Sequence, residues 1–416
     1  VIPALGYTTS PTDPRTTAET ILRAIHTKWV DGCDLVHVHN PLLAKNRSFL
    51  DVLGILQQQQ MTLFLQVHDF AEDGRPLSYS RQAYIPDCHY GVLNSRDYGI
   101  LLQSGLKTQG LHKIPNAVDP LDIEETAAIS NRVLYPVRAI RRKNIGEAIL
   151  LSLFFRQGET LAISRPPNSK ADMSSYADWK RYVKENNLPV EFEVGLQEDF
   201  ETLVNTSKYL LTTSITEGFG FSFLEPWVAG KMLWGRRLPD ICSDFITNDI
   251  RLDHLYDRLR VPLDWIGKKV FHDKWRTAVA NCAALFHAAI DPASIEDALA
   301  DVTREELVDF GLLDEHFQRQ VISRVLSGRQ HAEELITANA CLKQIGTLST
   351  EEALVAHNRK AVLDNYNSKD YGETLLTTYS HVIRKKVSQQ IDKKRLLSHF
   401  FDLKRFSLLK WADYRP

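Results

Sequence analysis

The chain has 416 residues and a formal net charge of −2, and 44% of its residues are hydrophobic and 25% charged. This composition is typical of a soluble globular protein, and the length predicts about two to three domains rather than a single core. The near-neutral charge excludes a molecule-wide attraction to polyanions, so we expect no nucleic-acid partner and only local basic surfaces.

Three features of the sequence bear on its location in the cell. There is no run of about 18 uncharged apolar residues, so we expect no membrane-spanning helix. The N-terminus lacks a basic segment followed by an apolar one, so no signal peptide is predicted. The five cysteines are scattered and form no Cys-x-x-Cys pair, which argues against a disulfide framework or a thiolate zinc site. We therefore expect a cytoplasmic protein.

Strand-like runs alternate with amphipathic segments in the first third of the chain. The strand-like runs cover residues 34–39, 62–67, 90–93 and 111–115, and the helix-like segments cover residues 18–30 and 48–60. Strands separated by helices predict parallel sheets with helices on both faces. Ligands of such sheets bind at the carboxyl ends of the strands, so functional side chains are expected there.

A change in composition near residue 120 predicts a domain boundary. Residues 120–131 are acidic and lack strand character, and a new strand-like run begins at residue 132. We therefore predict a first domain at residues 1–131 and a second at residues 132–383, with further strands at 160–163, 191–194 and 209–214. A helical insertion at about 294–346 is assigned only a packing role.

The last 33 residues, 384–416, contain ten Lys or Arg against three Asp. Apolar side chains recur among them at helical spacing: Leu396, Leu397, Phe400, Phe401 and Leu408. The pattern predicts a basic amphipathic C-terminal helix. Either its apolar face packs on the body of the protein, or its basic surface makes a peripheral contact with anionic lipid or an acidic partner. The two alternatives are compatible if the helix is only partly docked.

Two carboxylates, Glu217 and Glu225, lie eight positions apart around a glycine-containing, aromatic-rich turn. A strand-like run precedes this turn, and residues 223–230 after it predict a helix that ends at a glycine. A strand–loop–helix crossing presents backbone N–H groups where α/β proteins bind phosphate or sugar oxygens. Both carboxylates can then reach one ligand with several hydroxyls. The alternative is a solvated helix start at which Glu is favoured by the helix dipole.

Four cations follow the first strand of the second unit within residues 138–144. Such a loop is self-repelling unless an anion or a carboxylate binds there, and Arg and Lys are both suited to phosphate. The position at a strand's carboxyl end, just before a helix predicted at 145–155, favours a diphosphate over a solvated basic turn. Arg138 and Lys143 are the stronger candidates, and Arg141 and Arg142 are less certain.

Histidines lie at the ends of first-unit strands. His68 ends one strand beside Asp69, which favours a ligand contact over a purely structural role. His37 and His39 lie on one face of another strand and could hold a metal only with a third ligand. No third ligand is evident, so no metal site is predicted.

The carboxylate pair and the basic loop occur in the order found in one enzyme family. Glu217 and Glu225 resemble the Glu-x7-Glu signature of retaining GT-B glycosyltransferases, especially those of family 4. Arg138 and Lys143 are similar to the Arg-x4-Lys element with which that family grips the donor's diphosphate.

Weaker markers of the first domain extend this resemblance. His68 resembles the family's strand-end histidine beside the donor sugar, and Ser95 matches another recurrent position. Residues 114–119 are similar to the Ile-Pro-Asn-Gly-Val-Asp motif, with Ala117 in place of the glycine. The resemblance covers about residues 34–233, and weakly 367–379.

The resemblance implies an α/β protein of the GT-B class. Two Rossmann-like domains with parallel sheets would face each other across a cleft, the first on the acceptor side and the second holding the donor, with a helical C-terminal extension. The implied reaction moves a hexose, with retention and without a metal, from a nucleotide-diphosphate sugar such as a UDP- or GDP-hexose. The acceptor would be a small molecule, a glycan or a lipid-linked compound, and no other cofactor is implied.

The resemblance also assigns roles to individual residues. Glu217 and His68 would lie against the transferred sugar as catalytic residues. Glu225 would accept hydrogen bonds from the ribose. The diphosphate would be bound by Arg138, Lys143 and the backbone near Phe219, Gly220 and Phe221.

Two departures from the family leave other functions open. Residues 1–7 do not match the family's opening strand and glycine-rich loop, and residues 234–239 stand where an apolar strand and a second glycine-rich loop are usual. The alternatives are another GT-B enzyme, such as an epimerase or phosphorylase, and a non-catalytic scaffold. Neither the donor base nor the acceptor follows from these motifs.

Overall fold

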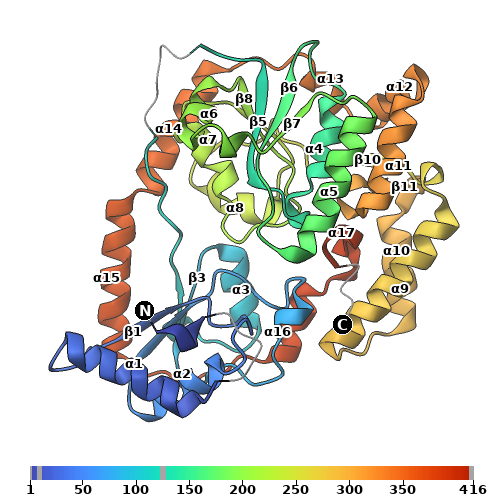
Figure 1. Cartoon of the computed structure of the whole chain (residues 1–416). Coiled ribbons are helices and arrows are strands. Elements are labelled where there is room, and N and C mark those ends of the chain that lie inside the picture. Colours follow the sequence, from blue (N-terminus) through green and yellow to red (C-terminus); the bar gives the residue numbers. More distant parts are fainter. Residues whose placement is uncertain (1, 7–11, 122–127, 412–416) are drawn as a thin grey trace.

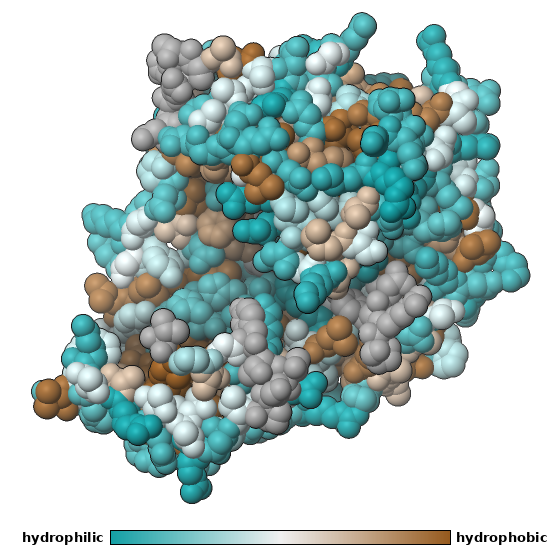
Figure 2. Space-filling model, in the orientation of Figure 1, coloured by the Kyte–Doolittle hydropathy of each residue, from teal (hydrophilic) through white to brown (hydrophobic). Residues whose placement is uncertain are grey.

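The computed structural model describes residues 2–6, 12–121 and 128–411, which form two α/β units that face each other (Figure 1). The first unit lies at the bottom of Figure 1 and the second at the top, and helix α15 (Ser368–Arg384) runs between them along one side. Hydrophilic residues cover most of the face shown in Figure 2. No described helix has both the length and the hydrophobicity needed to cross a membrane.

The first unit is built on a four-stranded parallel sheet. Its strands lie in chain order: β1 (Val36–His39), β2 (Leu63–Gln66), β3 (His89–Val92) and β4 (Leu111–Lys113). The helices of this unit are α1 (Pro14–Lys28), α2 (Phe49–Gln58) and α3 (Ser95–Gln103). Alternation along the strands sends Val38, Leu65 and Tyr90 into a core shared with these helices. The four strands predicted for this part of the chain are confirmed.

The opposite face of the first sheet is covered by α15. Phe64 and Val382 are buried there, and Nδ1 of His37 lies 2.8 Å from the hydroxyl of Tyr379. The sequence places residues 368–383 with the second domain, whereas in the structure α15 covers the sheet of the first unit. Strand alternation leaves this sheet face half polar, and one amphipathic helix with aromatic and histidine side chains complements it.

The second unit contains a five-stranded parallel sheet. Its order is β7 (Val190–Phe192), β6 (Thr160–Arg165), β5 (Arg132–Arg138), β8 (Tyr209–Thr212) and β9 (Leu233–Gly235). The chain therefore runs outward from β5 to β7 and returns to β8 on the other side of β5. The switch point lies between β5 and β8, where open α/β sheets bind their ligands.

Strand β9 corrects one expectation from the sequence. Residues 234–239 were expected to replace the usual strand, yet Trp234 and Gly235 belong to β9 and pair in parallel with β8. Gly235 has φ 132°, and a Cβ there would lie 1.9 Å from the carbonyl oxygen of Thr212, so only glycine fits. The strand has only three residues and is followed by the charged Arg236, so hydrophobic periodicity does not reveal it.

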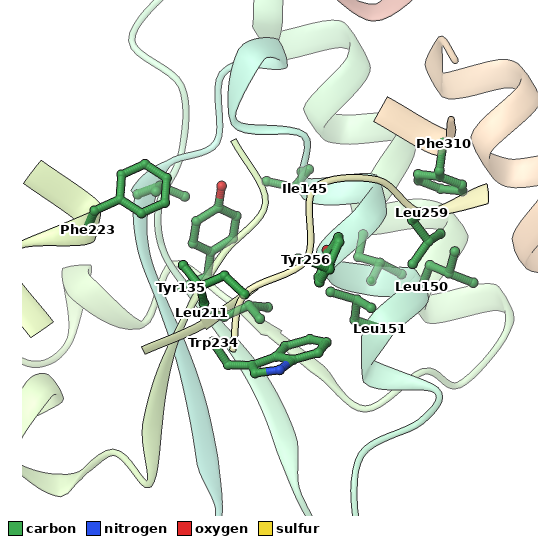
Figure 3. Close-up of a cluster of buried hydrophobic side chains, with 14 of the residues drawn as sticks. Tyr135, Ile145, Leu150, Leu151, Leu211, Phe223, Trp234, Tyr256, Leu259 and Phe310 are labelled. Atoms are coloured by element: carbon green, nitrogen blue, oxygen red, sulfur yellow. The ribbon is translucent and has the colours of Figure 1, made fainter. Parts of the chain in front are cut away.

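The core of the second unit lies between its sheet and helix α4 (Ile145–Ser152). In Figure 3, Tyr135 of β5, Leu211 of β8 and Trp234 of β9 lie together on neighbouring strands, beside Leu150 and Leu151 of α4. All five side chains are almost completely buried. Truncating a buried aromatic side chain of this kind costs about 3–5 kcal/mol. This packing makes the sheet a rigid base for the loops at its carboxyl edge.

The predicted insertion at 294–346 is mostly helical, with one short strand that the sequence did not reveal. It contains α10 (Pro292–Val302), α11 (Glu315–Leu326), α12 (Arg329–Ala338) and α13 (Cys341–Ile345). It also contains β11 (Leu307–Asp309), which pairs antiparallel with β10 (Arg260–Pro262). Strands of three residues are too short to show alternation.

The C-terminal segment is not the single helix predicted for 384–416. It contains α16 (Lys393–Phe400), a 3-10 turn at Leu403–Arg405 and α17 (Leu408–Trp411), and residues 412–416 lie outside the described part of the chain. Asp392 and Asp402 interrupt a longer helix, because each accepts hydrogen bonds from backbone N–H groups that follow it. The apolar side chains of the segment pack on the body, with Leu396 in the first core and Leu408 in the second.

A buried ionic network ties β9 to α4 and β11. Arg236 is 4% exposed. Its guanidinium donates to Glu147 at 2.7 and 2.8 Å and to Asp309 at 2.7 and 2.8 Å, and the hydroxyl of Tyr256 donates to Glu147 at 2.6 Å. Each buried charge therefore has a geometrically matched partner.

Replacing Arg236 by Met should lower the free energy of unfolding by about 3–5 kcal/mol, because Glu147 and Asp309 would remain charged without their partner. Urea unfolding followed by circular dichroism measures the change. Arg329→Met provides the matched control, because that guanidinium is exposed and should cost less than about 1 kcal/mol. Equal effects of the two variants would contradict a stabilising role for the network.

Candidate functional site

A small cavity lies between the two units. The first unit lines it with His68, Phe70, Asp69, Asp73, Arg75, Arg96 and Asp97, and the second with Arg142, Thr216, Glu217 and Gly218. The second-unit residues come from the loops after β5 and β8, which flank the switch point of the sheet. The second-unit wall of the cavity therefore lies at the carboxyl ends of two strands, where open α/β sheets bind their ligands.

The loop between Glu217 and Glu225 is shaped by two glycines. A Cβ at Gly218 would lie 2.7 Å from the carbonyl oxygen of His68, so the two units approach each other here at backbone distance. Gly220 has φ 100° and opens a 3-10 turn at Phe221–Phe223. The following helix is the short α7 (Glu225–Val228), which begins two residues later than the predicted 223–230. Glu225 is its first residue.

Glu217 is held as a buried anion. Its side chain is 8% exposed, Oε2 accepts from Nη1 of Arg142 at 3.0 Å, and Oε1 forms an ion pair with the ammonium of Lys143. Burial alone would raise the pKa of Glu217, but the two cations outweigh it and hold the pKa below its ordinary value. Glu217 is therefore a carboxylate at neutral pH, with two cations fixed beside it.

The four cations of the basic loop take different positions. Lys143 and Arg142 reach Glu217, whereas Arg141 donates to Glu315 of α11 at 2.7 and 2.9 Å. Arg138 is exposed at the end of β5 and is not among the described residues that line the cavity. The β5–β6 register is irregular between Tyr135 and Arg138.

The remaining motif residues lie beside this ion pair. Burial raises the pKa of Glu225, with Lys143 opposing the shift and Glu217 adding to it. Among the described residues, no hydrogen bond to the Glu225 carboxylate is formed. Phe219 is buried against Phe245 with ring centroids 5.9 Å apart, and Phe221 is 38% exposed. These two phenylalanines can therefore contribute only backbone N–H groups to a buried phosphate.

His68 belongs to a row of imidazoles that the sequence did not connect. Nε2 of His68 lies 2.9 Å from Nδ1 of His39, whose ring is 4.1 Å from that of His37. Burial lowers the pKa of His68, His39 lowers it further, and Asp69 only partly opposes the shift, so the ring is neutral at pH 7. The signal for this contact was the placement of His39 and His68 at the ends of adjacent strands. No cluster of three or more metal-binding side chains occurs within the described ranges.

Three ion pairs at or beside the cavity were not predicted from the sequence. Arg75 forms an ion pair with Asp69 at 2.7 Å, and Arg96 forms one with Asp97 at 2.8 Å. The ammonium of Lys410, on α17, pairs with Asp73, 337 residues away in the chain. A contact between residues so far apart in the sequence depends on the tertiary fold and cannot be predicted from a local motif.

Comparison with known proteins gives one sequence relative and several similar folds. No protein-family model matches the chain. It is 27% identical over 257 residues to mannosylglucosyl-3-phosphoglycerate synthase from Petrotoga mobilis, a match that covers 54% of this chain and 50% of that protein. The chain thus aligns with about half the length of this curated relative.

Two crystal structures of HepE from Anabaena resemble the whole arrangement. The complex with UDP and glucose has a TM-score of 0.51 at 10% identity, and covers 88% of this chain and 81% of that chain. The complex with UDP-glucose has a TM-score of 0.50 at 11% identity, with 88% and 82% covered. At such identities the likeness speaks for the fold alone. Together with the two parallel sheets, it confirms the predicted GT-B fold.

The histidine row predicts a pH dependence of stability. Burial and the neighbouring His39 lower the pKa of His37 to about 4. The unfolded chain therefore binds this proton more tightly, so the stabilising contribution is complete above about pH 6.5 and is lost as the pH falls towards 4. His37→Gln should reduce the difference between the urea midpoints at pH 7 and pH 5. His26→Gln, on the exposed face of α1, should retain the full difference, and an unchanged difference in His37→Gln would refute the assignment.

Proposed function

We propose that the chain is a retaining glycosyltransferase that moves a hexose from a nucleotide-diphosphate sugar to an acceptor. One observation carries the proposal: Glu217 is held between Arg142 and Lys143 at the switch point of a GT-B fold, facing His68 of the other unit across a cavity. The names of the compared proteins add support, because they include a mannosylglucosyl-phosphoglycerate synthase and a protein bound to UDP-glucose.

In this proposal the donor's diphosphate lies against Lys143 and Arg142. These cations supply the positive charge that Mg²⁺ supplies elsewhere, so the reaction needs no metal and no cofactor besides the donor. Backbone N–H groups near Gly220 complete the phosphate contacts, and Arg138 can reach the diphosphate only from the exposed rim. Preorganised contacts of this kind are worth a few kcal/mol each in the transition state.

The two carboxylates of the motif would have separate roles. Glu225 is half-buried, and its carboxylate has no hydrogen-bond partner within the described chain, which leaves it available to ribose hydroxyls. Glu217 is fixed as an anion and would stabilise the oxocarbenium-like carbon of the transferred sugar. His68 is neutral and would hydrogen-bond the same sugar from the opposite unit. The acceptor would then attack from the face on which the diphosphate departs.

The acceptor remains open among small molecules, glycans and lipid-linked compounds. Because the relative is named a mannosylglucosyl-3-phosphoglycerate synthase, a phosphoglycerate glycoside is the first compound to test as an acceptor. Product analysis with and without an acceptor separates a transferase from another GT-B enzyme. A scaffold would bind no sugar nucleotide at all.

A thermal-shift panel with UDP, GDP, ADP and their sugar conjugates tests the donor site directly. A ligand at about 100 times its Kd should add roughly 2.7 kcal/mol to the native state. A shift with one nucleotide family identifies the base. No shift with any nucleotide would contradict the proposed function.

Glu225→Ala should weaken binding of that nucleotide by about 10-fold or more, because a hydrogen bond to a charged group contributes about 1.5–3 kcal/mol. Isothermal titration calorimetry measures the affinity. Glu201→Ala, an exposed carboxylate in the first turn of α6 (Phe200–Thr206), is the matched control and should bind as wild type. Wild-type affinity in Glu225→Ala would exclude the ribose role.

Glu217→Gln should behave differently. Turnover should fall by about 100-fold or more because the charge beside the reacting carbon is lost. Nucleotide affinity should be unchanged or tighter, because Arg142 and Lys143 are then free to pair with the diphosphate alone. Steady-state rates and calorimetry on the same preparation separate the two effects. Parallel losses of affinity and rate would assign Glu217 to donor binding instead.

A further inference from the structure

The first unit contributes two arginines to the cavity opposite the basic loop. Arg75 lies in the loop after β2, and Arg96 lies in the first turn of α3. Their side chains are 27% and 21% exposed, so both are largely withdrawn from solvent yet reach the cavity wall. The donor site proposed above uses neither of them.

Each guanidinium is oriented by an aspartate. Nη2 of Arg75 donates to Asp69 at 2.7 Å, and Nε of Arg96 donates to Asp97 at 2.8 Å. Asp97 is itself held, because it accepts from the side-chain amide of Asn94 at 2.9 Å. Such anchoring fixes the planes of the guanidinium groups before any ligand arrives.

Both arginines keep donors that the anchoring does not use. In Arg75, Nη2 donates to Asp69 and Nη1 donates to the carbonyl of Phe70. In Arg96, Nε and Nη2 both contact the carboxylate of Asp97. Within the described ranges, Nε of Arg75 and Nη1 of Arg96 form no hydrogen bond. Neither atom is among the fully buried polar atoms without a partner, so both are accessible from the cavity or from solvent. Guanidinium donors in this position suit the oxygens of a phosphate or carboxylate.

The carboxylates of the cavity wall already have cationic partners. Asp69 pairs with Arg75, Asp97 with Arg96, Asp73 with Lys410, and Glu217 with Arg142 and Lys143. Burial alone would raise the pKa of Asp73, yet Lys410, Arg96 and Arg75 lower it to about 2. An anion that approaches Arg75 and Arg96 therefore meets carboxylates whose charges are paired.

We propose that Arg75 and Arg96 form an oxyanion subsite, and that the acceptor carries a phosphate or carboxylate group which these arginines bind. The inference rests on the proposed function, in which Arg142 and Lys143 hold the donor and the first unit faces the acceptor. The subsite belongs to the first-unit wall of the cavity, whereas Arg142 belongs to the second-unit wall.

The test uses the full chain saturated with the nucleotide that shifts its melting temperature, so that the diphosphate contacts are already filled. Three probes with the same carbon skeleton are titrated by calorimetry: glycerol, D-glycerate and glycerol 3-phosphate. We expect the phosphate or the carboxylate probe to bind and glycerol not to bind. The stronger of the two anionic probes identifies the group that the subsite prefers.

Arg75→Gln and Arg96→Gln should each weaken the anionic probe by about 10-fold or more, while nucleotide affinity changes by less than about twofold. Arg81→Gln, an exposed arginine of the same unit, should bind the probes as wild type. Arg75→Lys and Arg96→Lys keep the positive charge next to each aspartate but lose the planar guanidinium group with its several fixed N–H donors. They should also weaken the probe, and they keep the test valid if a glutamine variant fails to fold.

Equal binding of all three probes, or wild-type probe affinity in folded Arg75 and Arg96 variants, would overturn the subsite and leave the two ion pairs a structural role. Failure of the proposed function gives a different result, because no nucleotide would then bind. In that event the probes are titrated into the ligand-free protein. Anion binding that depends on Arg75 and Arg96 would still support the subsite.

Discussion

The structure depends on how a buried carboxylate is kept charged. Glu217 is 7% exposed and is stable as an anion only because Arg142 and Lys143 lie against it. Those cations come from the loop after β5, so the loops after β5 and β8 must meet at the switch point. Two buried hydroxyls connect these loops. The hydroxyl of Tyr135 donates to the carbonyl of Lys143 at 2.5 Å, and the hydroxyl of Thr213 donates to the same carbonyl at 3.2 Å.

The same loop joins the two units. The side-chain amide of Asn94 donates to the carbonyl of Gly218 at 2.7 Å, directly beside the close approach of Gly218 to His68. The C-terminal segment strengthens the junction, because α16 lies against α3 while Lys410 of α17 reaches Asp73. Residues 68–97 and 142–218 supply the walls of the cavity, and the C-terminal segment supports the first-unit wall through Asp73.

The two carboxylates of the motif have opposite electrostatic environments. Two cations hold the pKa of Glu217 low, whereas burial raises that of Glu225, which has no ion pair within the described chain. Titratable groups whose environments separate their pKa values usually have different tasks in an active site. This contrast matches a division between a charged group at the sugar and a hydrogen-bonding group at the ribose.

The sequence by itself determined the parallel strands of the first sheet, four of the five in the second, and the placing of Glu217 and Lys143 at strand ends, because hydrophobic alternation and short motifs are local properties. Tertiary structure alone decided that Arg142 rather than Arg138 meets Glu217, because that contact depends on how the loops after β5 and β8 come together. It also decided that α15 covers the first sheet and that Lys410 reaches Asp73. Those outcomes depend on contacts between segments far apart in the chain, and no local pattern encodes such contacts.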